Sequence, residues 1–475
     1  DAVRPPRAAR LMWERSARHR AVAGWLLSGG LAALPLALVY NRASDLPLTP
    51  AHVLLTLGTM ILVAMPPIAL SLGWDWAEGL WRTALLTVAA AAAFLVASVM
   101  QRVVAGRTPT ADQALNVMIY YQFAAALLSL PLLLFLASGA ARVRGVMPIV
   151  FGGVVVFGAA PFAATELWVA IGGTQAGTRA MLETPWLSSR HGLLVALALP
   201  FGVLMGWRLH ALAGAYAAKR FSDVQLLARA LWLMFVAIVA IDLLNSHPDR
   251  WWGAAAAATV ILLFAPLQRI VFRVIDVARD APPQVMLLLL RVFGFRSRTE
   301  RLFDRICARW RYHGPVTMIT APDIFSRTID AVDFLNWLLG RSGASFVRHA
   351  DELRARLAAI DAQRDPDGRF RVNEFCCADD AWRATVVELM QRADVVLMDL
   401  RGITRERKGC EFELQQFALR LPPERVVLVV DPGADRRVLN AALGEAAPRV
   451  RWFEMKRDRR ASNRALFEAL LGAAG

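Results

Sequence analysis

The chain has 475 residues, of which 20% are charged and 56% hydrophobic, and its formal net charge at pH 7 is +15. A mean hydropathy of +0.41 together with this charged fraction excludes both a wholly soluble enzyme and a protein made only of membrane helices. The charge does not indicate nucleic acid as a partner, because the arginines are spread along the polar part, are largely matched by acids and form no stripe interleaved with aromatics.

The averages conceal a change of solvent along the chain. We predict a basic cytoplasmic segment at residues 1–20, a polytopic transmembrane domain at 21–272, a connector at 273–284 and a cytoplasmic α/β domain at 285–475. The basic start is interpreted as the flank of a first span, since the apolar run that follows continues to Tyr40 and no small-residue cleavage site stands out.

About eight apolar stretches approach or exceed the roughly 20 residues that cross a bilayer, and backbone polar groups in lipid require these stretches to be helices. The predicted spans are Ala21–Tyr40, Val53–Leu72, Thr83–Met100, Val117–Ala137, Val146–Ile171, Gly192–Leu209, Leu226–Leu244 and Trp251–Phe272.

Basic residues alternate between the spans in a way that orients the domain. Six arginines lie in the first 20 residues, and the further groups are Arg142 and Arg144, Lys219 and Arg220, and Arg269, Arg273 and Arg279. All fall on one side if the chain crosses eight times, which predicts a bacterial inner-membrane protein with both termini in the cytoplasm. The four cysteines agree, because all lie in the polar part and adjacent Cys376 and Cys377 are poor disulfide partners.

Two acids fall within the predicted spans. An acid inside a membrane suggests a pathway for ions or protons, so Glu166 and Asp242 leave open a transporter with a regulatory cytoplasmic domain. The alternative is that both lie at interfaces, beside Trp168 and Asn245.

Short β-rich runs alternate with amphipathic stretches after Pro283. The predicted strands are 285–293, 316–320, 345–347, 370–377, 394–400, 425–430 and 450–455, and the predicted helices are 299–312, 329–339, 351–362, 382–392, 410–421 and 463–471. This alternation predicts a doubly wound, mainly parallel sheet in which the strand Val395–Leu400 is central, because it is apolar on both faces.

Ligands of such sheets bind outside the carboxyl ends of the strands. The candidate ligand-binding residues there are Arg291, Asp323, Asp399 and Arg401. Phosphate loops, dinucleotide fingerprints, zinc spacings and serine nucleophile elbows are all missing from the sequence, so we predict no metal and no resident cofactor.

The best-defined motif is the strand segment Ala393–Gly402 followed by Cys410-Glu-Phe-Glu-Leu414. We expect Glu411 and Glu413 in the first turn of a helix, where an ionised carboxylate is favoured. A carboxylate at a cleft can stabilise an oxocarbenium-like sugar or attack it, which makes Glu413 the candidate catalytic residue.

This order of elements resembles the central part of TIR domains, whose C-x-x-E-L helix carries the catalytic glutamate of NAD-cleaving members. It is similar also to nucleoside deoxyribosyltransferase-like domains, in which an A-D-hydrophobic-D-L strand precedes a catalytic glutamate. The resemblance covers mainly Asp380–Asp431. The sequence departs from both patterns: Gly409 replaces the usual TIR tryptophan, the loop 403–408 is strongly basic, and the deoxyribosyltransferase asparagine is missing.

The leading hypothesis is a membrane-tethered nucleotide-binding domain that cleaves the N-glycosidic bond of NAD or a related nucleotide. In it Glu413 acts at the anomeric carbon, Asp399 positions the ribose, and Arg291 and Arg401 hold phosphate. The alternative is a non-enzymatic signalling or assembly module, in which Glu413 is a solvated acid and Asp399 caps a turn. The expected partners are the lipid bilayer, a nucleotide and, as an open alternative, further copies of the chain.

Overall fold

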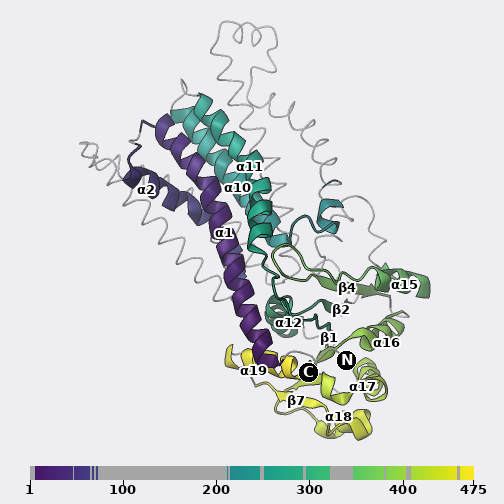
Figure 1. Cartoon of the computed structure of the whole chain (residues 1–475). Coiled ribbons are helices and arrows are strands. Elements are labelled where there is room, and N and C mark those ends of the chain that lie inside the picture. Colours follow the sequence, from purple (N-terminus) through teal and green to yellow (C-terminus); the bar gives the residue numbers. More distant parts are fainter. Residues whose placement is uncertain are drawn as a thin grey trace. The chain divides into compact units, whose positions relative to one another are not determined.

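The computed structural model describes residues 6–45, 48–64, 67–68, 71–72, 211, 214–246, 251–291, 296–320, 346–378, 381–402, 408–456 and 460–474 (Figure 1). The chain divides into two compact units. Residues up to 19 together with those from 277 onward form the α/β unit, and described residues between 20 and 276 form the helical unit. Four predicted spans (Thr83–Met100, Val117–Ala137, Val146–Ile171 and Gly192–Leu209), with Glu166, lie outside the described residues, as does Asp323.

The helical unit contains most of α1 (Arg7–Ala43), α2 (Pro50–Met60), the 3-10 turn η1 (Ile61–Ala64), α10 (Asp223–Ser246) and α11 (Trp251–Ile275). Within the described residues, α1 and residues 255–275 of α11 are long and apolar enough to cross a membrane, a property that a core helix of a soluble protein shares. The described residues therefore contain two candidate spans and not the eight expected for the whole chain.

The predicted span Val53–Leu72 does not form one long helix. Helix α2 ends at Met60 and continues as the 3-10 turn η1. In the sequence Pro66–Pro67 follows shortly after η1, and proline removes a backbone donor and disfavours the α conformation of the residue before it.

Helices α10 and α11 form an antiparallel pair (Figure 1). The ring of Trp232 in α10 packs 5.1 Å from that of Phe264 in α11. Near the other end of the pair, Gly253 leaves room for the side chain of Ala43 at the end of α1, since a Cβ built at Gly253 would lie 2.8 Å from the Ala43 Cβ. A reciprocal cap starts α10, since Ser222 Oγ accepts from the Gln225 amide and Gln225 Oε1 accepts from the Ser222 amide.

The α/β unit is built on a seven-stranded sheet in the order β3-β4-β2-β1-β5-β6-β7, and all its pairings are parallel. The strands are β1 (Leu287–Arg291), β2 (Val316–Thr320), β3 (Phe346–Val347), β4 (Val372–Cys377), β5 (Val395–Asp399), β6 (Val426–Val430) and β7 (Arg451–Glu454). The predicted parallel α/β architecture is confirmed. Strand β5 pairs on both sides and every one of its residues is buried, as its uninterrupted apolar run predicts.

Helices α12 (Arg296–Trp310), α15 (Ala350–Ala358), α16 (Trp382–Arg392), α17 (Lys408–Arg420), α18 (Arg436–Leu443) and α19 (Arg460–Ala473) accompany this sheet. Alternate residues of β5 enter two different cores. Val396 and Met398 pack with α16 and α17, whereas Val395 and Leu397 pack with α12 and α19. The sheet therefore has helices on both faces, which a parallel sheet requires to bury its strands.

Two differences from the predicted elements have local causes. Helix α15 ends at Ala358, four residues earlier than expected, because Asp361 and the following loop turn back to bond Asn373 beside β4. Helix α18 was not predicted; it is short, and the side chain of Asp435 caps it by accepting from the Arg437 amide.

Candidate ligand site at the carboxyl edge of the sheet

The strand order places a topological switch point between β1 and β5. The connection from β1 leads to β2 on one side, whereas β5, β6 and β7 extend the sheet on the other. Arg291, the last residue of β1, is the register partner of Asp399, the last residue of β5. Open α/β sheets bind their ligands outside the carboxyl ends of the strands at such a point. Two of the predicted site residues thus end neighbouring strands where a ligand is expected.

Asp399 and Arg401 form a buried two-pronged ion pair. Arg401 Nε donates to Asp399 Oδ1 and Arg401 Nη2 donates to Asp399 Oδ2, both at 2.8 Å. Thr299 Oγ1, in the first turn of α12, also donates to Asp399 Oδ2 at 2.8 Å, and Arg401 Nη1 lies 3.3 Å from Met455 Sδ. The Asp399 carboxylate therefore binds both Arg401, just after its own strand, and Thr299 of α12. Sequence reasoning missed Thr299, since no local pattern links it to a residue 100 positions later.

Basic residues are concentrated in the segments that follow β1 and β5. Helix α12 begins at Arg296, with Arg298 in its first turn, and α17 begins at Lys408. Both helices start just after a strand ends, so their N-terminal ends, which carry partial positive charge, belong to the same edge of the sheet. This arrangement of charge favours an anionic ligand.

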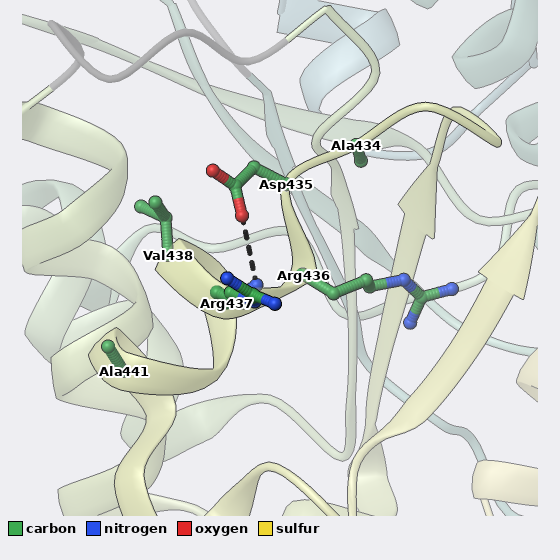
Figure 2. Close-up of a pocket in the computed structure, with 6 residues that line it drawn as sticks. All are labelled: Ala434, Asp435, Arg436, Arg437, Val438 and Ala441. Carbon is green, nitrogen blue, oxygen red and sulfur yellow. Dashed lines mark hydrogen bonds between the residues drawn. The ribbon is translucent and has the colours of Figure 1, made fainter.

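An open pocket of about 840 Å³ lies beyond the carboxyl end of β6, around the start of α18. Six residues line it: Ala434, Asp435, Arg436, Arg437, Val438 and Ala441 (Figure 2). Figure 2 shows Arg436 extending away from Val438 and Ala441, and its guanidinium stacks 4.3 Å from the Trp452 ring centre. The sequence pattern predicted this strand end but not the two arginines, which follow the Asp431-Pro-Gly433 turn two residues later and directly after the capping residue Asp435.

The ends of β5 and β6 are joined by one hydrogen bond, in which the Gly402 amide donates to Asp431 Oδ2 at 2.8 Å. Gly402 has a φ of +73°, a conformation that glycine adopts without strain. This hydrogen bond therefore holds the chain that leaves β5 against the end of β6.

Glu413 lies in a different environment from the one expected. Because α17 begins at Lys408, Glu413 is in its second turn and not in the first. Its side chain is only 3% exposed, and its Oε2 atom has no hydrogen-bond partner. Burial raises the pKa of Glu413 to about 8, so the carboxyl is predominantly protonated at neutral pH. Glu411, by contrast, is exposed.

The structure does not bring Glu413 and Asp399 together. Glu413 shares a helix face with Cys410, Leu414 and Phe417, which pack in the core under α16 and α17. Asp399 bonds Thr299 of α12, which packs on the other face of the sheet. The backbone therefore places Arg291 next to Asp399 and Arg401 at the switch point, whereas Glu413 lies on the opposite face of the sheet.

The N-terminal part of α1 belongs to the α/β unit through a buried ion cluster around Glu14. Arg309, near the end of α12, donates to both carboxylate oxygens of Glu14 at 3.1 and 3.0 Å. His313 Nε2 lies 3.2 Å from Glu14 Oε2, and Arg18 pairs with the same carboxylate. Glu14 lies ahead of the apolar stretch of α1. Burial alone would raise its pKa, but the hydrogen bond with His313 and the positive charges of Arg18 and Arg309 lower the pKa to about 2.

Backbone contacts reinforce this attachment. Arg10 Nη1 donates to the Pro283 carbonyl and Trp13 Nε1 donates to the Arg279 carbonyl, each at 3.0 Å. The segment predicted as a basic tail is thus a structural part of the α/β unit, and the helix it begins runs on to Ala43 in the helical unit.

Among the described residues there is no group of three or more His, Cys, Asp and Glu side chains arranged to hold a metal ion. Comparison with models of known protein families, with characterised proteins and with solved structures finds no match.

Proposed function

We propose that the chain is a membrane protein of about eight spans whose cytoplasmic α/β unit binds a nucleotide at the switch point and transmits its occupancy to helix α1. One observation carries this proposal: α12 contacts the candidate site near one end and α1 near the other. Thr299 bonds Asp399 beside the switch point, and Arg309 bonds Glu14 of α1. A helix of this length spans about 22 Å and moves as a rigid rod.

The Asp399–Arg401 pair supplies an element with two states. Arg401 donates to Asp399 through Nε and Nη2 and contacts Met455 Sδ through Nη1, so a phosphate held by Arg401 competes with these partners. Opening the pair changes the partner set of Asp399, whose Oδ2 atom also accepts from Thr299. A phosphate that competes for Arg401 therefore acts on α12, and a ligand shifts such an equilibrium by its difference in affinity for the two states.

A nucleotide fits the site better than a neutral ligand does. The segments at this edge begin two helices and carry Arg291, Arg296, Arg298 and Lys408. Helix N-terminal ends and arginine forks both favour phosphate oxygens. The pocket beyond β6, with Arg436 and Arg437 in its lining, offers space beside the same edge for the rest of the molecule.

The test uses the full-length protein in detergent, with NAD and adenine nucleotides as probes. We expect NAD or a related nucleotide to bind and to change amide hydrogen exchange in residues 7–19. Thr299→Val should retain binding but lose the change in α1, because the bond between the site and α12 is removed. The matched control is Thr317→Val, since Thr317 is also buried but bonds the Leu287 carbonyl in the neighbouring strand. Absence of binding by every nucleotide, or an unaltered α1 response in Thr299→Val, rejects the proposal.

Glycosidic cleavage by Glu413 is a second candidate, favoured by the buried carboxyl whose Oε2 atom has no partner. Cleavage requires that a sugar reach the face of the sheet that carries α17 and that the carboxyl ionise there. Glu413→Gln should then abolish release of the base while Glu411→Gln, on the exposed side of the helix, leaves it unchanged. Nucleotide binding without any product from the wild-type protein supports the non-enzymatic alternative.

A further inference from the structure

Buried polar groups without hydrogen-bond partners lie side by side in the helical unit, between α10 and α11. Arg229 Nε donates to Gln268 Oε1 at 2.9 Å. Two other donors of this pair, Arg229 Nη2 and Gln268 Nε2, are both buried and have no hydrogen-bond partner. Gln268 is fully buried and Arg229 is half-buried. Two neighbouring buried donors without an acceptor carry a substantial free-energy cost, which an added acceptor would remove.

The required acceptor is anionic. Arg269 lies close enough to Arg229 for their positive charges to repel. Neither arginine forms an ion pair within the described part of the chain, and Arg273 follows one turn later on the exposed side of α11. Cations held together without a counter-charge are stabilised by an anion that bridges them.

The position of the cluster along the two helices identifies the source of that anion. At about 1.5 Å per residue, Arg229 lies about 25 Å along α10 from Ser246, and Gln268 lies about 25 Å along α11 from Trp251. The hydrocarbon core of a bilayer is about 30 Å thick. If the ends joined at Ser246 and Trp251 lie at one membrane surface, the cluster lies near the level of the phosphates at the other.

The outer surface of α11 beside the cluster is apolar. Leu262, Leu263, Ile270 and Val274 are between 57% and 78% exposed, and they share the exposed side of the helix with Arg269 and Arg273. An apolar surface ending in arginines is complementary to a lipid, whose chains cover the former and whose phosphate reaches the latter. Basic pockets between membrane helices are known to hold anionic headgroups.

We propose that Arg229, Gln268 and Arg269 form a binding site for the phosphate of an anionic lipid in the cytoplasmic leaflet. The proposal rests on the membrane placement given above. Basic flanks favour the cytoplasmic side, and Lys219 and Arg220 precede α10 at this end. In the bound state Arg229 Nη2 and Gln268 Nε2 donate to phosphate oxygens, and Arg269 supplies the second charge.

The experiment measures lipid binding to the full-length protein in neutral detergent by native mass spectrometry. The probes are phosphatidylglycerol, phosphatidylcholine and inorganic phosphate. We expect selective retention of phosphatidylglycerol, and about a tenfold loss of its affinity in Arg229→Gln, because one charge-assisted hydrogen bond contributes roughly that factor. The control is Arg42→Gln, which removes one positive charge from the last turn of α1 and should leave lipid binding unchanged.

Each comparison of variants or probes either supports or overturns the proposed lipid site. Equal binding of phosphatidylglycerol by wild type and Arg229→Gln overturns the site, and saturation by inorganic phosphate alone overturns the assignment to lipid. If Arg229→Gln does not purify, Arg269→Gln takes its place, because the exposed Arg269 side chain can be changed without opening the helix interface. Failure of the membrane placement is distinguishable, since the wild-type protein would then remain in solution without detergent.

Discussion

Two buried carboxyl groups in the α/β unit respond to pH in opposite directions. Arginines and a histidine surround Glu14, which lowers its pKa to about 2, whereas Glu413 lies among apolar side chains and its pKa rises to about 8. Ion pairing dominates in the first case and desolvation in the second. Burial by itself therefore does not tell which carboxyl is charged, and the identity of the neighbours decides.

Glu413 should make the protein less stable as the pH rises. Its pKa in the folded state is above the unfolded value of 4.5, so its favourable contribution is complete below pH 4.5 and is lost between pH 4.5 and about 8. We expect Glu413→Gln to remove this loss, which thermal unfolding of the full-length protein between pH 5 and 8.5 will measure. A parallel decline in wild type and variant would show that Glu413 is not buried in solution.

Glu14 should have the reverse effect. Its pKa in the folded state is below the unfolded value, so the stability it contributes is present above pH 4.5 and is lost as the pH falls toward 2. Glu14→Gln at neutral pH leaves Arg309 and Arg18 without their carboxylate, and removal of one partner of a buried ion pair costs about 3–5 kcal/mol. Denaturant unfolding measures this loss.

The control for Glu14 is Asp351→Asn, which breaks an ion pair with Arg354 on the surface of α15. Exposed pairs contribute about 0–1 kcal/mol, so this variant should unfold almost as the wild type does. Similar losses in the two variants would contradict the buried cluster.

The backbone at Gly314 lies very close to the backbone at Val285. Gly314 precedes β2, and a Cβ built there would lie 1.9 Å from the carbonyl oxygen of Val285. Val285 itself receives a hydrogen bond from Trp310 at the end of α12. The junction of α12, β1 and β2 is thus closed to any side chain at this position, which fixes how the chain passes from the C-terminal end of α12 into β2.

Gly314→Ala should destabilise the α/β unit by several kcal/mol or prevent its folding, because the methyl group would displace backbone atoms and not a flexible side chain. Gly433→Ala is the matched control, since no atom lies within 4 Å of its added Cβ. Unfolding temperatures of the two variants give the comparison. A normal melting temperature for Gly314→Ala would show that this junction is looser in solution.

At the scale of the whole molecule, one helix belongs to both units. Residues 7–19 of α1 complete the α/β unit, and its apolar part begins the helical unit. Such a shared helix gives the two units a covalent connection in addition to the one after Ile275.

The proposed topology places both termini in the cytoplasm, because the basic segments alternate to that side. A reporter enzyme that is active only in the periplasm, fused after Gly475, should give no signal in intact bacteria. A fusion at the segment between Ser246 and Trp251 is the positive control and should be active. A strong signal from the C-terminal fusion would reverse the orientation.

Most of the strands and helices of the α/β unit could be predicted from the sequence. Strand β5 is apolar from Val395 to Met398 and is bounded by Asp394 before it and by Arg401-Gly402 after it, a pattern that predicts an interior strand of a parallel sheet. The alternation of such runs with amphipathic helices then set the class of fold. These are local properties, and local patterns reveal them.

The protonation and the partners of the candidate residues, by contrast, depend on contacts between distant parts of the chain. The sequence predicted that Glu413 is an ionised acid at the start of a helix. The helix begins earlier, at Lys408, and the Glu413 side chain therefore points toward an apolar core. Arg401 looked like a free anion ligand, but it pairs with Asp399, which in turn bonds Thr299. The partners of a buried charge come from distant parts of the chain, and their free energy depends on desolvation and geometry that no sequence window contains.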